Sequence, residues 1–485
     1  MYKPIAVFHA GRMSFSCLRH IDGCEKKQYS LEMNGNYALD DSIVALATPF
    51  GESAIAVIRL SGADCLERLD KVFKGAQRPS ETPGYRLIYG LVMEPVTNEA
   101  IDQVLLAVYR GPRSYSGENS AEVFCHGSPA IIKRLLDLFT RVGFRDAGPG
   151  EFTLRAFSNG KIDLTRAEAV NEIIRSKTDK ARSLALSRLS GSIEEAINKV
   201  KDQILDLRTA VEIRLDYPDE EIGGSTELDA DLDSLSSQLK SLIDTYSTGK
   251  MYQEGAVVAI AGRTNAGKST LFNLLLREDR AIVSDIHGTT RDFIEGLISV
   301  QGVPVRLFDT AGLRQTDNPI EQEGIKRTDR LIENAQALIY VIDASSGLEE
   351  EDRRHLEGFE KKIPLVCLWN KSDKSRTPPP EAFIPFSALE GKGVEALNQA
   401  LAAILVKNSS TESSSPVIDS LRQKNLLEKA LLALSHLKKG ISDEQPLDML
   451  AVDIKDALDA LGEITGEITT SDLLEKMFSR FCVGK

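Results

Sequence analysis

Cysteine is scarce in this sequence, and long apolar runs are absent from it. No uninterrupted stretch reaches the roughly 20 apolar residues of a membrane-spanning helix, so no span is expected. The cysteines follow neither a metal-binding spacing nor the pattern of a disulfide framework; they are Cys17, Cys24, Cys65, Cys125, Cys367 and Cys482. This usage is typical of a reducing compartment, and it predicts a cytoplasmic protein.

Basic residues are outnumbered, since 59 Lys and Arg against 72 Asp and Glu give a net charge of −13. This balance argues against a broad, sequence-independent nucleic-acid surface, although it allows a local basic groove. The length of 485 residues predicts about three domains. Residues 1–40 lack the apolar core of a secretory signal, and their acidic residues do not fit a transit peptide. We expect a disordered extension there, or a true first residue at Met13 or Met33.

The spacing of apolar residues divides the chain into regions of three kinds. Residues 41–158 contain short apolar runs separated by Gly and Pro, which predict an α+β domain. In residues 159–254, and again in 409–485, apolar residues recur at three- and four-residue spacing, which predicts long amphipathic helices. Between them, in 255–408, strand-length apolar runs alternate with helical stretches and predict a Ras-like α/β domain with a mainly parallel sheet. We therefore expect one all-α domain interrupted by an inserted nucleotide-binding domain.

The inserted domain opens with a phosphate-binding loop. An apolar run, 256–261, leads into Gly-Arg-Thr-Asn-Ala-Gly-Lys-Ser at 262–269. This GxxxxGK[ST] pattern lets backbone N–H groups face phosphates at a helix N-terminus. Lys268 is expected to reach the β- and γ-phosphates, and the Ser269 hydroxyl to bind Mg²⁺. The residues of this loop expected to contact the nucleotide are Asn265, Ala266, Gly267, Lys268, Ser269 and Thr270.

Three further motifs follow in the order typical of a GTPase. They are Asp309-Thr310-Ala311-Gly312, Asn370-Lys371-Ser372-Asp373 and Ser387-Ala388-Leu389. Asp309 is expected to hold Mg²⁺ through water, and the Gly312 amide to sense the γ-phosphate. The Asp373 carboxylate can accept from both N1–H and N2–H₂ of guanine, a pair of donors that adenine lacks. The Ser387 loop would offer a backbone amide to guanine O6. Together the motifs predict a GTP-binding domain, called the G domain below.

Two features concern hydrolysis. Leu313 stands where many GTPases place a water-orienting glutamine, and leucine cannot hydrogen-bond an attacking water. Thr290 is expected to be the second Mg²⁺ ligand and, with Lys268, to act in catalysis. A monovalent cation, K⁺, could lie beside the phosphates and replace an arginine finger by its charge. Its expected ligands are Asn265 and the oxygens around Ser284, Ile286 and Thr289. Ser284, Thr289 and Thr290 are also expected to contact the nucleotide.

With these motifs in place, the chain from about Asp41 to Lys485 resembles the bacterial tRNA modification GTPase family MnmE (TrmE). The resemblance also rests on segments outside the G domain, which are 41–51, 114–118, 148–157, 159–164 and the terminal Phe481-Cys-Val-Gly-Lys485. Ser128 departs from the family, where a second glycine is usual, and Val483 replaces an isoleucine. Residues 1–40 are not family-like.

The resemblance implies a homodimeric GTPase that acts with a flavin-dependent partner, MnmG (GidA), in a heterotetramer. Its implied task is to install an aminomethyl or carboxymethylaminomethyl group at C5 of the tRNA wobble uridine. The implied one-carbon donor is 5-formyl-tetrahydrofolate or a relative, bound in an N-terminal domain that also dimerises. Arg59, Glu122, Lys161 and Lys485 match the family's folate-contacting positions. Considered alone, the first three are typical of solvated surface charges.

Two further matches concern chemistry. Cys482 matches the family's C-terminal motif cysteine, which is thought to take part in the modification; a small buried hydrophobe is the alternative. Glu321 matches the acidic residue that orients the hydrolytic water in the family, which fits the role that Leu313 cannot fill. Nearby Glu323 is the alternative to Glu321.

Two rival functions remain. A ribosome-assembly GTPase switch would share residues 256–390, but it predicts an appended RNA-binding module such as a KH domain, and no GXXG loop in a basic setting stands out after Asn408. A folate-dependent enzyme with an inactive G domain would not need the intact Lys268, Ser269 and Asp373.

Overall fold

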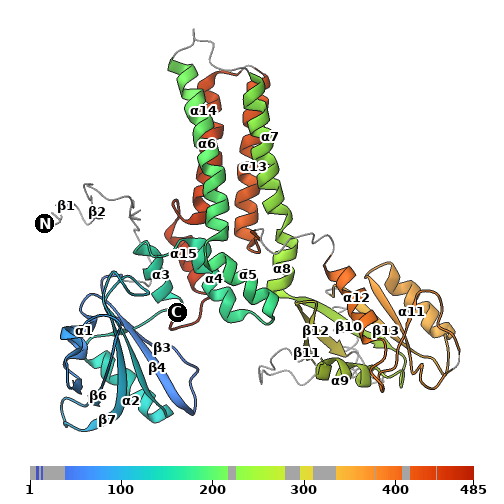
Figure 1. The fold of residues 1–485 in the computed structure, drawn as a ribbon, viewed down its shortest axis with the longest axis horizontal. Coiled ribbons are helices and arrows are strands. Elements are labelled where there is room, and N and C mark those ends of the chain that lie inside the picture. The colour runs from blue at the N-terminus through green and yellow to red at the C-terminus, as the bar shows by residue number, and fades with distance from the viewer. Residues whose placement is uncertain are drawn as a thin grey trace, which may run out of the picture. The chain divides into compact units, whose positions relative to one another are not determined.

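The computed structural model forms two compact units, one of residues 1–171 with 462–485 and one of residues 172–461 (Figure 1). The residues whose structure it describes are 7–9, 12–14, 39–216, 225–278, 295–309, 335–375, 377–406, 416–443 and 445–485. Near the N-terminus, β1 (Val7–His9) and β2 (Arg12–Ser14) pair antiparallel. Among the helices of these ranges, none has both the length and the apolar composition needed to cross a bilayer.

The first unit is built on a seven-stranded sheet with the order β5-β6-β7-β8-β4-β3-β9. Neighbouring strands are antiparallel, except for β3 and β9. The strands are β3 (Ile43–Leu46), β4 (Ser53–Ser61), β5 (Phe73–Gly75), β6 (Arg86–Met93), β7 (Ala100–Tyr109), β8 (Ser120–Gly127) and β9 (Arg145–Asp146). The helices are α1 (Cys65–Leu69), the 3₁₀ turn η1 (Pro79–Glu81), α2 (Pro129–Arg141), α3 (Glu151–Ser158), the start of α4 (Leu164–Arg175) and α15 (Ser471–Phe478).

The two faces of this sheet differ in what they bury. Helices α1 and α2 cover one face, where Ile58 and Leu60 of β4 join their apolar side chains in one core. Because side chains alternate along a strand, Arg59 between them points to the opposite face. That opposite face also carries Leu87 and Tyr89 of β6, which are 57% and 58% exposed. One face is therefore core, and the other is available for ligands or partners.

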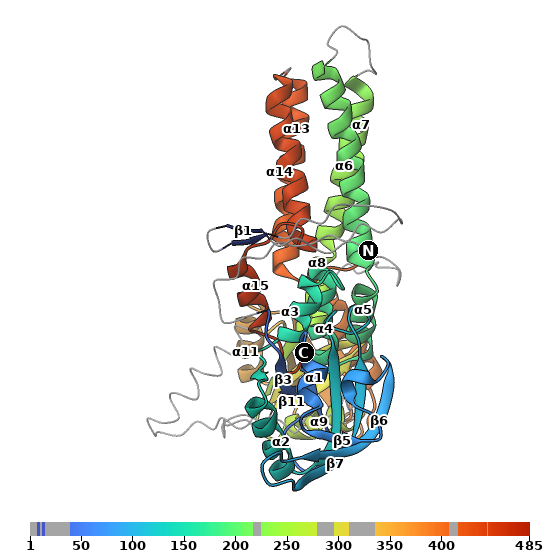
Figure 2. The same ribbon diagram turned by 90° about the vertical axis from the view of Figure 1, so that its left-hand side faces the viewer.

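The second unit contains a helical part and the G domain. The helices α6 (Ser192–Asp216), α7 (Ser225–Asp244), α13 (Leu421–Ser442) and α14 (Leu447–Thr465) run side by side in both views (Figures 1 and 2). Two shorter ones, α5 (Asp179–Leu189) and α8 (Tyr246–Glu254), lie at one end of them. Along α13 the buried residues Leu427, Ala430 and Leu434 recur at three- and four-residue spacing, so one stripe of the helix faces its neighbours.

The G domain is built on a six-stranded sheet with the order β11-β12-β10-β13-β14-β15. Only β11 runs antiparallel to its neighbour among these strands. The strands are β10 (Ala256–Gly262), β11 (Glu295–Val300), β12 (Val303–Asp309), β13 (Ala337–Asp343), β14 (Leu365–Asn370) and β15 (Phe383–Pro385). The described helices of this domain are α9 (Lys268–Glu278), α11 (Glu350–Glu360) and α12 (Val394–Leu405).

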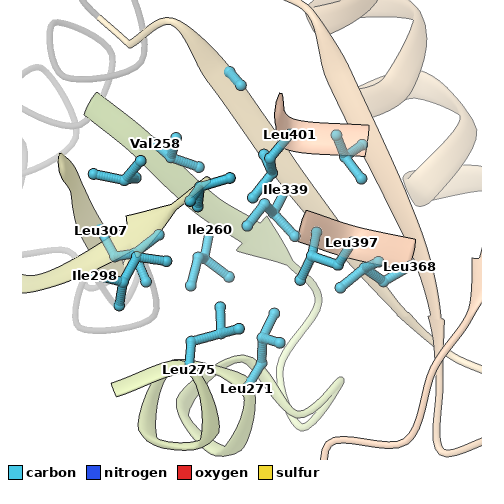
Figure 3. Packing of buried hydrophobic residues seen from close by; sticks show 14 of the residues in the cluster. Val258, Ile260, Leu271, Leu275, Ile298, Leu307, Ile339, Leu368, Leu397 and Leu401 are labelled. Atoms are coloured by element: carbon cyan, nitrogen blue, oxygen red, sulfur yellow. The ribbon is translucent and has the colours of Figure 1, made fainter. Parts of the chain in front are cut away.

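Both faces of the G-domain sheet are buried, as its uninterrupted apolar strands predict. On one face, Ile260 and Ile339 pack with Leu271 of α9 and Leu397 of α12 (Figure 3). On the other face, alternate residues of the same strands, such as Leu338, pack with side chains of α11. In a sheet of this kind the loops at the carboxyl ends of the parallel strands form the binding crevice. The four GTPase motifs of the sequence all follow such strand ends.

Candidate functional site

The phosphate-binding loop joins β10 to α9. Asn265 has a φ of 63° and Gly267 a φ of 98°, so the loop bends through left-handed conformations. A Cβ on Gly267 would lie 2.2 Å from the side chain of Asn370, which explains why glycine is required there. Lys268 Nζ donates to the carbonyls of Gly262 at 2.7 Å and Arg263 at 2.8 Å. Burial lowers the pKa of Lys268, and the charge of Asp309 opposes that shift.

The expected Mg²⁺ ligands of the described residues lie together. Ser269 Oγ donates to Asp309 Oδ2 at 3.0 Å, although 40 residues separate them in sequence. They meet because β10 and β12 are adjacent parallel strands and both residues follow or end a strand at the same edge. A hydroxyl and a carboxylate are hard oxygen donors of the kind that Mg²⁺ prefers, so this pair fits the ion.

Asn370 ties the phosphate loop to the base-binding loops. This residue is buried at the end of β14, its Nδ2 donates to the Ala266 carbonyl at 2.7 Å, and its Oδ1 accepts from the Ala388 amide at 3.0 Å. Both polar atoms of its amide are thus used within the protein. The side chain therefore joins the loop of residues 262–269 to the loop that begins at Ser387.

The other residues predicted to read the base meet around the same strand ends. Ser387 Oγ donates to Asp373 Oδ1 at 2.7 Å, which fixes the orientation of the carboxylate. Lys371 Nζ donates to the Asn265 carbonyl at 2.8 Å and pairs with Asp343 at 2.6 Å. Lys371 therefore connects the Asn-Lys-Ser-Asp motif to the phosphate loop. Asp343, at the end of β13, has no recognisable motif around it, and sequence reasoning missed it.

Several predicted site residues lie outside the described residues. They are Ser284, Ile286, Thr289, Thr290, Thr310, Ala311, Gly312, Leu313, Glu321 and Glu323. The second Mg²⁺ ligand, all predicted K⁺ ligands except Asn265, and the predicted water-orienting group belong to this set. Their roles stay predictions.

A second site lies on the open face of the first unit's sheet. It is a cavity of about 220 Å³ lined by Arg59, Tyr109, Tyr115, Ser116, Ser120, Glu122, Phe152 and Lys485. Arg59 and Glu122 are directly opposite each other on β4 and β8, and they form an ion pair at 2.8 Å. Arg59 Nη1 also donates to the Gly484 carbonyl at 2.9 Å. The strand pairing thus brings Arg59 and Glu122 together, and the C-terminal segment adds Lys485, so three predicted folate-contacting residues line one cavity.

The cavity combines aromatic faces with charge. The Arg59 guanidinium lies 5.6 Å from the ring centre of Tyr115 and 5.8 Å from that of Phe152. Tyr109 Oη donates to Glu122 Oε2 at 3.3 Å. Burial lowers the pKa of Lys485, the neighbouring Arg59 lowers it further, and Glu122 opposes both. A planar ligand with N–H donors and an anionic group fits such a lining.

The structure does not bring every predicted residue of the first unit to this cavity. Lys161 is exposed, and its Nζ donates to the Pro112 carbonyl at 2.9 Å; it does not line the cavity. Cys482 is also exposed, and its carbonyl accepts from the Gly150 amide at 3.2 Å. The buried side chain beside it is Phe481, so Cys482 is not the docking hydrophobe of this segment.

Comparison with known proteins decides the family. The model for the MnmE helical domain matches residues 164–482, and the model for the N-terminus of the GTP-binding protein TrmE matches residues 42–161. The tRNA modification GTPase MnmE of Carboxydothermus hydrogenoformans is 39% identical over 461 residues, which are 92% of this chain and 100% of that protein. The chain belongs to the MnmE family of tRNA modification GTPases.

A second MnmE protein matches over a similar length, and a solved structure matches a smaller part of the chain. The MnmE protein of Alkaliphilus oremlandii is 40% identical over 92% of this chain and 100% of its own length. Among solved structures, Aquifex aeolicus Era bound to GDP.AlF4- covers 37% of this chain and 67% of its own, with 24% identity and a TM-score of 0.27. The membership in the MnmE family does not depend on that last match.

Sequence reasoning missed part of the cavity of this MnmE-family chain. Tyr109, Tyr115, Ser116, Ser120 and Phe152 line it, yet none had been assigned a role. A signal was present, because Tyr115 and Ser116 belong to the segment 114–118 that marks the family resemblance. That the five residues meet depends on the pairing of β7 with β8 and on the position of α3, which the sequence pattern does not specify.

Proposed function

We propose that this chain is a GTP-hydrolysing enzyme of tRNA wobble-uridine modification. The observation that carries the GTPase proposal is the Asn370 side chain, which joins the phosphate loop at Ala266 to the base-binding loop at Ala388. Both halves of a guanine nucleotide site are thereby held at a fixed spacing. The relatives named tRNA modification GTPase, matched over their whole length, support the tRNA substrate.

Each described residue of the site has a separate task in this proposal. Lys268 would exchange its carbonyl partners for the β- and γ-phosphates. Ser269 would bind Mg²⁺ directly and Asp309 through water, and the ion would neutralise the charge that develops on the phosphates. Asp373, oriented by Ser387, would select guanine. Hydrolysis would drive opening and closing of two G domains and would not itself be the modification step.

Potassium is proposed as the substitute for an arginine finger, with Asn265, Ser284, Ile286 and Thr289 as its ligands. Replacing K⁺ by Na⁺ at constant ionic strength should lower GTP turnover by roughly tenfold or more, because a smaller ion fits the same oxygens poorly and its charge then no longer stabilises the transition state. Steady-state phosphate release in the two salts measures this. Equal turnover in both would remove the cation from the mechanism.

Glu321 is proposed to orient the hydrolytic water. Glu321→Ala should slow GTP hydrolysis by roughly 10²–10³-fold, in the range for a lost water-positioning or acid–base group, while GTP affinity stays near normal. Glu323→Ala is the matched control, since it removes the same charge two residues away. Single-turnover hydrolysis and nucleotide affinity are measured for both variants. Slow hydrolysis in the Glu323 variant alone would reassign the role.

We also propose that the cavity on the open sheet face binds 5-formyl-tetrahydrofolate or a related one-carbon tetrahydrofolate. Glu122 would accept from N–H donors of the pterin, and the cations Arg59 and Lys485 would bind anionic groups. The aromatic faces of Tyr115 and Phe152 suit a planar ring. When bound, the folate supplies the one-carbon unit. Lys161 would have to reach this ligand from outside the cavity lining.

Partners follow from the same proposal. The open sheet face carries exposed Leu87, Tyr89 and Leu105, an apolar patch of the kind that marks protein interfaces, which supports a homodimer through this domain. A monomer in sedimentation velocity at micromolar concentration would contradict it.

The flavin-dependent MnmG is proposed as the second protein and the cytoplasm as the location. Cys482 is proposed to take part in the chemistry because it is exposed beside the terminal residues of the cavity.

Loss of the protein should abolish the proposed tRNA modification. In a deletion strain, the C5 aminomethyl and carboxymethylaminomethyl nucleosides should fall below about a tenth of the wild-type level, because the modification loses both the proposed GTPase and the proposed folate site. Liquid chromatography and mass spectrometry of digested tRNA measures them. A plasmid copy should restore them. An unchanged nucleoside profile would favour the ribosome-assembly switch as the function.

A further inference from the structure

Behind one wall of the cavity lies a buried ionic network. Arg155 of α3 is 1% exposed and pairs with Glu118 at 3.2 Å, Glu151 at 3.0 Å and Asp41 at 2.7 Å. Burial lowers the pKa of Arg155, but Glu118 and the other carboxylates have the larger effect, so the pKa of Arg155 is raised. The Glu118 carboxylate is therefore held in one place by a fixed cation.

Glu118 connects this network to three serines. Ser61 Oγ donates to Glu118 Oε2 at 2.8 Å, and Ser61 is fully buried. Ser61 Oγ also lies 2.6 Å from Ser116 Oγ and 3.2 Å from Ser120 Oγ. Ser116 and Ser120 line the cavity, whereas Ser61 and Glu118 do not. The serines meet because Ser61 and Ser120 are opposite each other on β4 and β8.

The hydrogen bonds of this group fix the direction of its protons. A carboxylate can only accept, so the single hydroxyl proton of Ser61 is committed to Glu118. Ser61 must then accept from Ser116, whose proton points into the wall. The Ser120 hydroxyl has Ser61, Ser116 at 3.1 Å and the Glu118 carbonyl at 3.3 Å as partners, and all belong to the same wall. Ser120 therefore keeps lone pairs for the cavity, and Ser116, which also accepts from the Glu118 amide at 3.3 Å, keeps at most one.

We propose that Glu118, held by Arg155, is a positioning residue that makes Ser116 and Ser120 hydrogen-bond acceptors for N–H groups of the bound ligand. Together with the Glu122 carboxylate they form an acceptor wall, while Arg59 and Lys485 supply cations elsewhere in the cavity. Such a wall selects a heterocycle with an amino group on its edge, such as the 2-amino-4-oxo ring of a tetrahydrofolate. The inference rests on the proposed folate site and adds how its specificity arises.

The test compares two ligands on the full-length protein by isothermal titration calorimetry. One is 5-formyl-tetrahydrofolate, and the other is its 2-desamino-2-methyl analogue, in which a methyl group replaces the amino donors. The wild type should prefer the amino compound by roughly 10–100-fold, as expected for lost hydrogen bonds that leave buried acceptors unpaired. Glu118→Ala and Ser61→Ala should each reduce this ratio by about tenfold, because each removes an acceptor of the wall and leaves a serine proton free to turn into the cavity.

Controls separate this role from a structural one. Glu99→Ala removes a carboxylate of an exposed ion pair with Arg134 on the same domain, and it should leave the ratio unchanged. A purely structural role for Glu118 would weaken both ligands equally and keep the ratio. If Glu118→Ala does not fold, Ser61→Ala, which removes one hydroxyl, gives the same readout. If the wild type binds both ligands and the variants keep the wild-type ratio of affinities, the inference about Glu118 is overturned while the folate site stands. If the wild type binds neither ligand, the proposed folate site is overturned as well.

Discussion

Asp373→Asn should change the nucleotide preference from GTP to xanthosine triphosphate. Two charge-assisted hydrogen bonds to guanine contribute roughly 1.5–3 kcal/mol each, so losing them should weaken GTP binding by roughly 10²–10⁴-fold. Ser387 donates to Asp373 Oδ1 at 2.7 Å, and it should hold the asparagine oxygen in the same way. The amide N–H₂ would then face the base, where the C2 carbonyl of xanthine accepts from it.

The measurement is a competition of GTP and xanthosine triphosphate for a fluorescent nucleotide on wild type and variant. Glu390→Gln is a matched control, because Glu390 lies in the loop of Ser387 and pairs with Lys392 on the surface. It should leave the preference for GTP intact. A variant Asp373→Asn that still prefers GTP would show that another group reads the base.

Lys268→Met should lower GTP turnover by roughly 10²–10³-fold, the cost of removing one preorganised donor from a developing oxyanion. In the structure the ammonium group donates to the carbonyls of Gly262 and Arg263 and is only 7% exposed. It is thus held at the phosphate loop by the backbone of that loop. Methionine keeps an unbranched side chain, one atom shorter, and removes the charge.

Turnover is measured at saturating GTP, and thermal unfolding checks that the variant is folded. Lys362→Met, at an exposed position in the same domain, loses the same charge and should keep wild-type turnover. Wild-type hydrolysis by the Lys268 variant would mean that the loop does not hold the phosphates as proposed.

Features of the G domain that depend on contiguous residues can be predicted from the sequence, whereas contacts that depend on the order of the strands cannot. The phosphate loop is one contiguous motif, so the sequence predicts Lys268 and Ser269 directly, and the parallel sheet follows from strands that are apolar on both faces. The contact between Ser269 and Asp309 follows once β10 and β12 are neighbours. The link from Lys371 to Asp343 could not be predicted, because Asp343 is an isolated carboxylate whose partner depends on the order of the strands.

The cavity of the first unit shows the opposite case. Arg59 and Glu122 came from the family resemblance and not from any pattern of their own, and they meet only because β4 and β8 pair in that register. The serine group behind the wall could not be predicted, since Ser61, Ser116 and Ser120 are ordinary residues until the fold places their hydroxyls within 3.2 Å of one another. Long-range strand pairing, which sequence periodicity does not encode, determines this site.

The most direct test of the proposed function is nucleotide hydrolysis by the purified full-length protein in Mg²⁺ and K⁺. We expect saturable conversion of GTP to GDP and phosphate, and no conversion of ATP at the same concentrations, because the Asp373 carboxylate finds its pair of donors only on guanine. Equal hydrolysis of both nucleotides, or of neither, would contradict a guanine nucleotide site built from the phosphate loop and Asp373.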